Sequence, residues 1–322
     1  MANPKKRNLN QVVDAVPNFP FEATVRDVRF DKTFKILLGE NEVRTMSFLN
    51  AVLGLSGENR IMKISFMNGS TPELHNRSIS FDLKIEAKCH SYSGHIFIVE
   101  MQKARHKGHT NRWIYYGARE LFKMGGNKHE ETITGEFYVS LCPVKVITIV
   151  DFDVRDDDLR NTEDYLVHWD ITERSSKIIA SDLLSWTYII LPQFTKQLAK
   201  EPTSDFTGKL LEAWLNLFTM KDQATVMVTP EMTAHDAPLA EAFLRVSRLE
   251  KHEIDAVDED IKLESEYWAV IAEKTKEAVR DIKLEIEEKD KVIAEKDKEM
   301  EEKDKEMAVM KKELAALKSG KK

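Results

Sequence analysis

The alternation of apolar and polar residues is clearest in the segment SISFDLKIEAKCHSYSGHIFIVEMQ, residues 78–102. Over residues 79–86 the two classes alternate strictly, which is typical of a strand with one buried face. The second half is apolar on both faces until it reaches Glu100 and Gln102. Residues 91–94, Ser-Tyr-Ser-Gly, are turn-like and separate the two halves. The pattern therefore predicts a β-hairpin.

A hairpin centred near residue 91 places Asp82 opposite Glu100, and Gln102 shares the face of Glu100 because side chains alternate along a strand. Opposed carboxylates destabilise a sheet and raise each other's pKa unless a cation lies between them. Mg²⁺, which takes carboxylate oxygens and water, would solve this, and Mn²⁺ accepts similar ligands. Such an ion could activate water for phosphodiester cleavage. The alternative is a sheet edge at which Asp82 pairs with Lys84 or Lys103.

Helical and strand-like patterns flank the hairpin. They comprise a helical segment over residues 31–55 that breaks at Gly39, a strand over 61–66, a helix from Thr110 or Asn111 to Met124, strands over 137–154 broken at Pro143, a strand over 183–191, and helices over 206–218 and 234–256. Helix and strand periods thus succeed one another along the chain. This order predicts an α/β fold with a mixed sheet.

A basic segment, residues 103–112, follows the acidic pair directly. A polyanion drawn to the pair would meet these cations first. Tyr116 lies four residues beyond Arg112, on the same side of the predicted helix. Lys103, Arg105, Arg112 and Tyr116 are therefore candidates for phosphate contacts, and a solvated basic surface is the alternative.

From about residue 264 the composition shifts to Glu, Lys and Asp. Apolar residues then recur every seventh position, at Val279, Ile286, Ile293, Met300, Met307 and Leu314. If these are heptad positions a, the d positions hold Ile282, Met310 and Leu317 but also Lys289, Lys296 and Lys303. This pattern predicts a long charged helix, either a dimeric coiled coil or a solvated single helix.

The length of 322 residues allows one sizeable domain with an extension. We expect a basic arm over residues 1–20, a globular domain over 21–260 and a helical tail over 261–322. The basic N-terminus is followed by no apolar run, and no apolar stretch approaches the roughly 20 residues of a membrane helix.

Charge and cysteine usage narrow the functional classes. A net charge of −7 gives no global support for a nucleic-acid partner, so a local basic patch would have to bind one. The two cysteines lack the paired spacing of a zinc site or disulfide framework, which indicates a reducing cytoplasm. We expect Asp151 and Asp153 to be exposed loop carboxylates away from the hairpin.

Four ordered blocks, FDKTFKILLG, RSISFDLKIEAKC, IFIVEMQ and NRWIYYGARELF, resemble the PD-(D/E)XK nuclease family transposases, also called recombination-promoting nucleases. The resemblance covers about residues 27–155 and extends more weakly to about 260. It implies a restriction-endonuclease-like αβββαβ core, with Asp82, Glu100 and Gln102 at the catalytic positions. The proline of the motif is replaced by Phe81. Its lysine is replaced by Gln102, a residue common in this family, so the change does not by itself imply inactivity. No ammonium stands at that position, and Lys84 or Lys103 could substitute for it.

Two functional hypotheses follow from this resemblance. The first is a Mg²⁺-dependent DNA endonuclease of transposase or recombination type, with Lys103, Arg105, Arg112 and Tyr116 against DNA phosphates. The second is a non-catalytic DNA- or protein-binding module that keeps the nuclease-like fold and uses the C-terminal tail for interaction, including homodimer formation.

Overall fold

The computed structural model describes residues 20–67, 70–71, 79–80, 82–87, 94–105, 108–126, 141–154, 163–200 and 209–319. The predicted N-terminal arm up to residue 19, the predicted turn at 91–93 and the start of the predicted strand at 137–140 lie outside these ranges. Within them, no helix is both long and apolar enough to cross a membrane.

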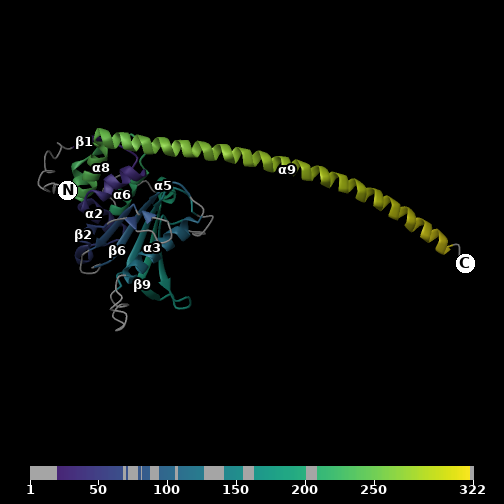
Figure 1. Ribbon diagram of the computed structural model, residues 1–322, viewed down its shortest axis with the longest axis horizontal. Helices are drawn as coiled ribbons and strands as arrows, with labels where there is room; N and C mark the ends of the chain where they lie inside the picture. Colours follow the sequence, from purple (N-terminus) through teal and green to yellow (C-terminus); the bar gives the residue numbers. More distant parts are fainter. Residues whose placement is uncertain are drawn as a thin grey trace. The chain divides into compact units, whose positions relative to one another are not determined.

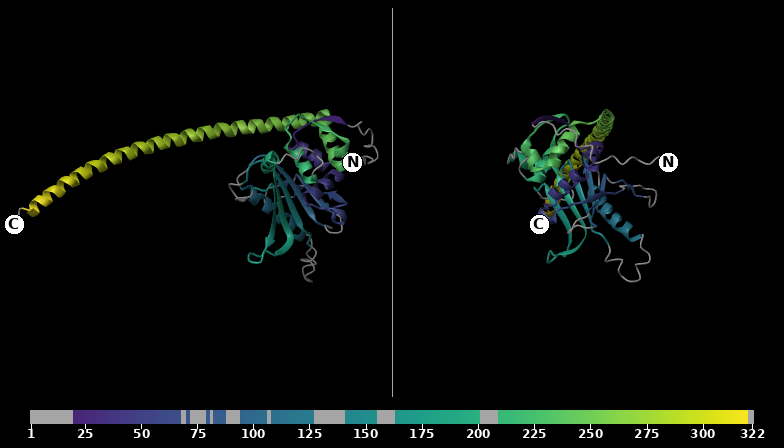
Figure 2. Two further views of the ribbon diagram at one scale, coloured as in Figure 1. Left: turned by 180° about the vertical axis from the view of Figure 1, so that it is seen from behind. Right: turned by 90° about the vertical axis from the view of Figure 1, so that its left-hand side faces the viewer.

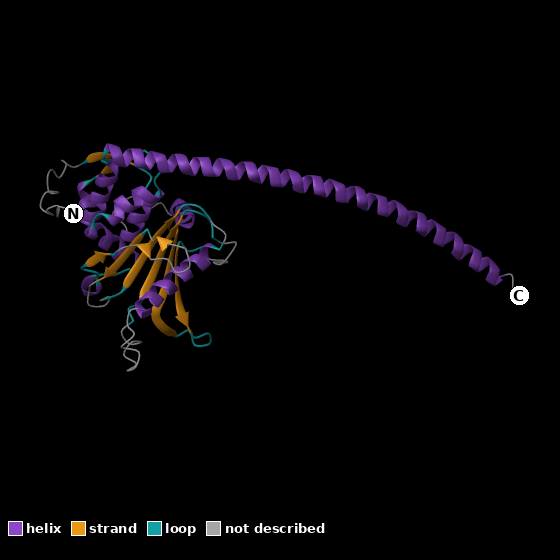
Figure 3. Cartoon of the chain, in the orientation of Figure 1, coloured by secondary structure: helices purple, strands orange, loops and turns teal. Residues whose placement is uncertain are grey.

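Strands and helices alternate through the first 260 residues (Figure 3). The strands are β1 (Phe21–Val25), β2 (Ile64–Phe66), β3 (Ser70–Thr71), β4 (Ile79–Ser80), β5 (Leu83–Ala87), β6 (Ile96–Gln102), β7 (Val144–Val150), β8 (Leu166–Thr172), β9 (Ile179–Ile190) and β10 (Ala224–Val228). The helices are α1 (Asp31–Gly39), α2 (Glu42–Val52), η2 (Gly57–Asn59), α3 (His109–Gly126), α5 (Leu191–Lys200), α6 (Leu210–Thr219), α7 (Pro230–His235), α8 (Ala237–Ser247) and α9 (Lys251–Ser319).

The central element is a six-stranded mixed sheet in the order β2-β5-β6-β7-β9-β8. Strands β2, β5 and β6 are antiparallel, β6, β7 and β9 are parallel, and β8 returns antiparallel to β9. The β8–β9 hairpin extends beyond the first residue of β7, Val144 (Figure 2). The succession α2, β2, β5, β6, α3, β7 is the αβββαβ core that the sequence predicted.

Each face of the sheet has its own hydrophobic core. On β6, Phe97 and Val99 belong to the larger core, which contains residues of α1, α2, α6 and α8, whereas Ile96 and Ile98 belong to the smaller core under α3. Trp113 of α3 is fully buried in the smaller core. Figure 1 shows α3 against one face of the sheet. Because successive residues of β6 face opposite cores, its register decides which side Glu100 faces.

The register of the β5–β6 hairpin is the predicted one, with Leu83 paired to Val99 and Lys84 paired to Ile98. The first arm, however, is not one continuous strand. Its residues Ile79 and Ser80 form β4 in a separate small sheet with β3. Asp82 lies at a bend immediately before β5, so it is held at the mouth of the hairpin rather than inside the ladder.

Helix α1 packs closely on β5. A Cβ atom at Gly39 would lie 2.8 Å from Cδ2 of Leu83, so any other residue here would force the Leu83 side chain to shift. The predicted break at Gly39 is confirmed, since α1 ends there and α2 begins after Asn41, whose side chain accepts hydrogen bonds from the N–H groups of Val43 and Arg44.

Two sequence-based expectations were wrong. The single helix over residues 234–256 is divided into three, because the Asp236 carboxylate caps α8 by accepting from the Leu239 N–H at 2.7 Å and the helix ends again at Ser247. Strand β8 was not expected. It is an edge strand whose outer residues are largely exposed, so its apolar alternation is weak.

Contacts within the chain divide it into two units, Met1–Asp260 and Ile261–Lys322. The second unit is helical up to residue 319, as the continuation of α9. Its described side chains, up to residue 315, are exposed or half-buried.

Candidate active site

Asp82 and Glu100 lie side by side where the β5–β6 hairpin opens. The Asp82 N–H donates to Glu100 Oε1 at 3.2 Å, and the Met101 N–H donates to Asp82 Oδ2 at 2.8 Å. Only 2% of Glu100 is exposed. The main chain of each strand thus fixes the carboxylate of the other.

Both carboxyl groups hold their protons more tightly than usual. Burial raises the pKa of Asp82 to about 6 and the pKa of Glu100 to about 8, and the charge of Asp82 adds to the effect on Glu100. At neutral pH the pair therefore favours a bound proton or a bound cation. This is the electrostatic condition that the hairpin pattern predicted.

Helix α1 contributes two further charged groups, Asp31 and Lys35, which the sequence reasoning missed. Their side chains form an ion pair at 2.6 Å, one helical turn apart. Besides burial, the charge of Asp31 and a hydrogen bond with it raise the pKa of Asp82, and the charge of Lys35 lowers the pKa values of Asp82 and Glu100. The four side chains form one charge cluster, three carboxylates and one ammonium.

A signal for this pair was present in the FDKTFK block, where Asp31 and Lys35 stand four residues apart at a helix start. The spacing alone did not reveal that the side of α1 that carries Asp31 and Lys35 lies beside the β5–β6 hairpin. That placement depends on the contact of Gly39 with Leu83.

Gln102 is linked to helix α3 through Arg112. The Arg112 Nη1 donates to Gln102 Oε1 at 3.3 Å, and its Nε donates to the Tyr116 hydroxyl at 2.6 Å. Arg112 is exposed, whereas Tyr116 is only 6% exposed. Burial and the charges of Glu100 and Asp82 raise the pKa of Tyr116, while its bond to Arg112 lowers it. The structure thus brings Gln102, Arg112 and Tyr116 next to the carboxylate pair.

The other predicted cations have different partners. Lys84 is buried and pairs with Glu120 of α3, while Lys103 lies 3.6 Å from Asp27 and 3.3 Å from the ring centroid of Phe30. Lys35, rather than Lys84 or Lys103, is the lysine whose charge acts on both site carboxylates. Arg105 is exposed and follows Gln102 by three residues in the chain.

A partly buried ion-pair network joins the ends of strands β6 and β7 to the loop before α1. Arg29 donates to Asp27 and to Asp151, each at 2.8 Å, and the Asp151 N–H donates to the Gln102 carbonyl at 3.0 Å. Asp151 is therefore not an exposed carboxylate far from the hairpin, as we expected. Because β6 and β7 are parallel, their carboxyl ends meet, and the network ties both to the loop before α1.

Comparison with known proteins agrees with this architecture. A family model described as PD-(D/E)XK nuclease family transposase matches residues 28–274. The chain belongs to this family. No curated protein sequence and no solved structure matches the chain. Membership in the PD-(D/E)XK transposase family indicates a nuclease-type function, with DNA as the implied substrate, and the match includes the whole mixed sheet and the charge cluster.

PD-(D/E)XK nucleases typically use divalent metal ions, and the oxygen donors of this site fit that use. Asp82 and Glu100 offer oxygen only, and because burial raises the pKa of both carboxyl groups, a cation bound here would stabilise their ionised forms. Within the described ranges, no group of three or more His, Cys, Asp or Glu is arranged as a metal site. A Mg²⁺ ion held here would therefore depend on two carboxylates and on water or substrate oxygens, which is its common habit.

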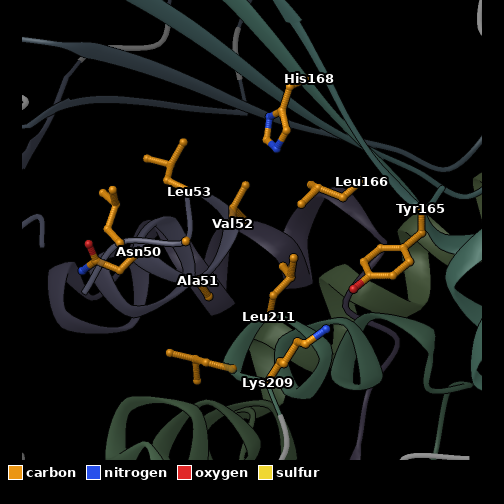
Figure 4. A pocket seen from close by; sticks show the side chains of 12 residues that line it. Asn50, Ala51, Val52, Leu53, Tyr165, Leu166, His168, Lys209 and Leu211 are labelled. Atoms are coloured by element: carbon orange, nitrogen blue, oxygen red, sulfur yellow. The ribbon is translucent and has the colours of Figure 1, made fainter. Parts of the chain in front are cut away.

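A separate hollow of about 540 Å³ lies on the opposite side of the sheet from α3. It is bordered by the end of α2, the start of α6 and strand β8, and Figure 4 shows Leu53, Leu166 and Leu211 around it with His168 above. The His168 Nδ1 lies 3.0 Å from Thr187 Oγ1, and burial lowers its pKa. None of the charge-cluster residues borders this hollow.

Proposed function

We propose that the protein is a Mg²⁺-dependent DNA endonuclease of transposase or recombination type. Asp82 and Glu100 hold the metal, for which Mn²⁺ can substitute, and Gln102 completes the site. The observation that carries this proposal is Glu100, a 98% buried carboxylate with a raised pKa beside a second carboxylate, in a chain of a nuclease family. A buried carboxylate pair of this kind costs stability and is best explained by the cation it binds.

Mg²⁺ bound at this pair would neutralise phosphate charge and favour deprotonation of a water molecule. The Gln102 amide lies at the end of β6, on the Glu100 face, where its oxygen already accepts from Arg112. This leaves the amide N–H groups of Gln102 to donate to a phosphate oxygen or to orient the attacking water. Because Gln102 is neutral, the charge that develops on the phosphate needs a cation from elsewhere.

Lys35 is the residue that we assign to this task. Burial lowers its pKa, but the hydrogen bond and charge of Asp31 and the charges of Asp82 and Glu100 outweigh that and raise it, so the ammonium stays charged at neutral pH. Asp31 holds it one turn along α1, and 39% of the Lys35 side chain is exposed, so it can reach a substrate. A fixed ammonium beside a developing oxyanion is a recognised source of rate enhancement.

DNA phosphates would be bound along the exposed side chains next to the site. Arg112 and Arg105 are exposed, and Lys103 is partly exposed. Tyr116 is too buried for a major phosphate contact, so in this proposal it positions the Arg112 guanidinium through their 2.6 Å hydrogen bond. Residues 21–260 would then form the nuclease domain, with residues 1–20 as a basic arm and 261–322 as a tail.

A plasmid assay tests this proposal. Purified protein should nick or linearise supercoiled DNA with Mg²⁺ and stop when a chelator is added. Cleavage that continues in chelator would contradict the metal site. DNA binding without turnover in Mg²⁺, Mn²⁺ or other divalent ions would instead support the non-catalytic alternative, against which the intact set of Asp82, Glu100 and Gln102 argues.

A further inference from the structure

The C-terminal unit exposes a regular apolar seam along α9. Its members recur every seventh residue and are each 47–63% exposed: Val279, Ile286, Ile293, Met300, Met307 and Leu314. Ile282 and Met310 lie three residues after two of them and are 55% and 60% exposed. Six heptads of apolar residues in water are unfavourable for a helix that remains alone.

The exact seven-residue period indicates what kind of partner covers this seam. A straight α-helix has 3.6 residues per turn, so a strict heptad stripe drifts by about 20° per repeat. The stripe stays in line only when the helix supercoils around a second helix with the same period. The chain itself provides a helix with that period, so a second copy meets the requirement.

Charged residues beside the seam select the orientation. The three d-position lysines are each followed by an e-position aspartate, in the pairs Lys289–Asp290, Lys296–Asp297 and Lys303–Asp304. In a parallel, in-register pair, a d side chain packs beside the e residue of the partner, so each lysine meets an aspartate. Of the flanking g–e′ pairs, Glu306 faces Lys311 of the partner, but Glu285 faces Asp290 and Glu299 faces Asp304, so the parallel orientation rests on the lysine–aspartate contacts.

An antiparallel pair centred on the seam would be opposed by charge. It sets e positions against e positions and g positions against g positions, which brings Asp290 against Asp304 and Glu285 against Glu313. The parallel pair does place each d lysine opposite its counterpart, which weakens the middle of the seam. Apolar a and d layers stand at both ends of the seam. They are formed by Val279 and Ile282 at one end and by Met307 and Met310 at the other.

We propose that residues 272–315 pair with the same segment of a second copy as a parallel, in-register coiled coil. The protein is then a dimer that carries two nuclease-type units. This assembly does not depend on the proposed cleavage chemistry, so dimer formation and DNA cutting can fail separately.

Sedimentation equilibrium of the full chain tests the assembly. The expected mass is twice 37.1 kDa. Ile286→Asp, on the seam, should weaken association by at least about tenfold. Leu284→Asp is the matched control, because Leu284 is equally exposed (55% against 52%) but lies on the outer face of the helix. A monomeric wild type, or equal weakening by both variants, would overturn the proposal.

Disulfide trapping tests the orientation. In a chain with Cys89→Ser and Cys142→Ser, Leu314→Cys should give a disulfide-linked dimer on mild oxidation, since parallel pairing brings the two copies of position 314 together. Failure of this variant to cross-link, combined with cross-linking between an Ile286→Cys chain and a Met310→Cys chain, would show an antiparallel pair and overturn the proposed register.

Discussion

Asp82 donates its backbone N–H to the Glu100 carboxylate at 3.2 Å, although the two residues lie eighteen positions apart in the chain. The bond places two carboxyl groups together in a site from which water is largely excluded. The positions of the two carboxyl groups are thus fixed by the fold, while neither group neutralises the negative charge of the other. Both features are expected of a site that is completed by a cation.

Glu100→Gln should stabilise the metal-free protein while removing its activity. The folded-state pKa of Glu100 is raised to about 8 from an ordinary value of 4.5, so folding favours the protonated form. The associated stability is fully present below pH 4.5 and is lost as the pH rises through about 8. At pH 8 the variant should therefore exceed wild type by on the order of 2 kcal/mol in urea unfolding. Destabilisation by this isosteric change would contradict the electrostatic account.

Metal binding should become tighter as the pH rises. A cation must displace the protons that burial holds on Asp82 and Glu100, so Mg²⁺ affinity should increase between about pH 6 and pH 8 with release of protons. Titration calorimetry in two buffers of different ionisation enthalpy measures the number of protons released. Affinity that is independent of pH over this window would place the metal elsewhere.

Lys35→Met should reduce the cleavage rate by roughly 10²–10³-fold at saturating Mg²⁺. Metal affinity should not fall, because the substitution removes a competing positive charge beside Asp82 and Glu100. Lys35→Arg should recover part of the rate. Lys32→Met, an exposed position on the same helix, serves as the control for loss of a surface charge. Equal rates for Lys35→Met and wild type would contradict the role of Lys35 and leave Lys84 and Lys103 as candidates for the cationic group.

Lys84→Met should act on stability rather than on chemistry. Lys84 and Glu120 are 7% and 3% exposed, so the substitution leaves a buried carboxylate without its cation. We expect a loss of about 3 kcal/mol in the free energy of unfolding, with an unchanged rate per folded molecule. A folded variant with a strongly reduced rate would instead assign Lys84 to the site.

Arg112→Ala should weaken DNA binding, and Tyr116→Phe should have a smaller effect in the same direction. Arg112 is exposed and reaches both Gln102 and the Tyr116 hydroxyl, whereas Tyr116 acts only by holding the guanidinium. Fluorescence anisotropy with a labelled duplex at two salt concentrations measures the DNA affinity of both variants. A larger effect of Tyr116→Phe than of Arg112→Ala would contradict these roles.

The hairpin and its acidic pair could be predicted from the sequence because strand alternation and turn position are local properties. The register that brings Leu83 opposite Val99 is the one expected from the pattern. The bend at Asp82 was missed, since the alternation continues through residues that the structure assigns to two sheets.

The charge cluster could not be completed in the same way. Asp31 and Lys35 reach the site because α1 packs on β5, where Gly39 lies against Leu83 across more than forty residues of sequence. Long-range packing also decides the environment of Asp151. From local composition we expected an exposed loop carboxylate, but Asp151 pairs with Arg29. Local patterns predicted the elements, while long-range packing decided which charges meet.

The central claim is tested most directly by single-turnover cleavage of supercoiled plasmid in Mg²⁺ by wild type, Glu100→Gln and Glu86→Gln. Glu86 is a partly buried carboxylate of the same hairpin that does not border the Asp82–Glu100 pair, so it controls for loss of a charge from this sheet. We predict that wild type and Glu86→Gln cut at similar rates, and that Glu100→Gln is roughly a thousandfold slower. Cleavage by Glu100→Gln at the wild-type rate would contradict the claim that this buried carboxylate forms the metal site.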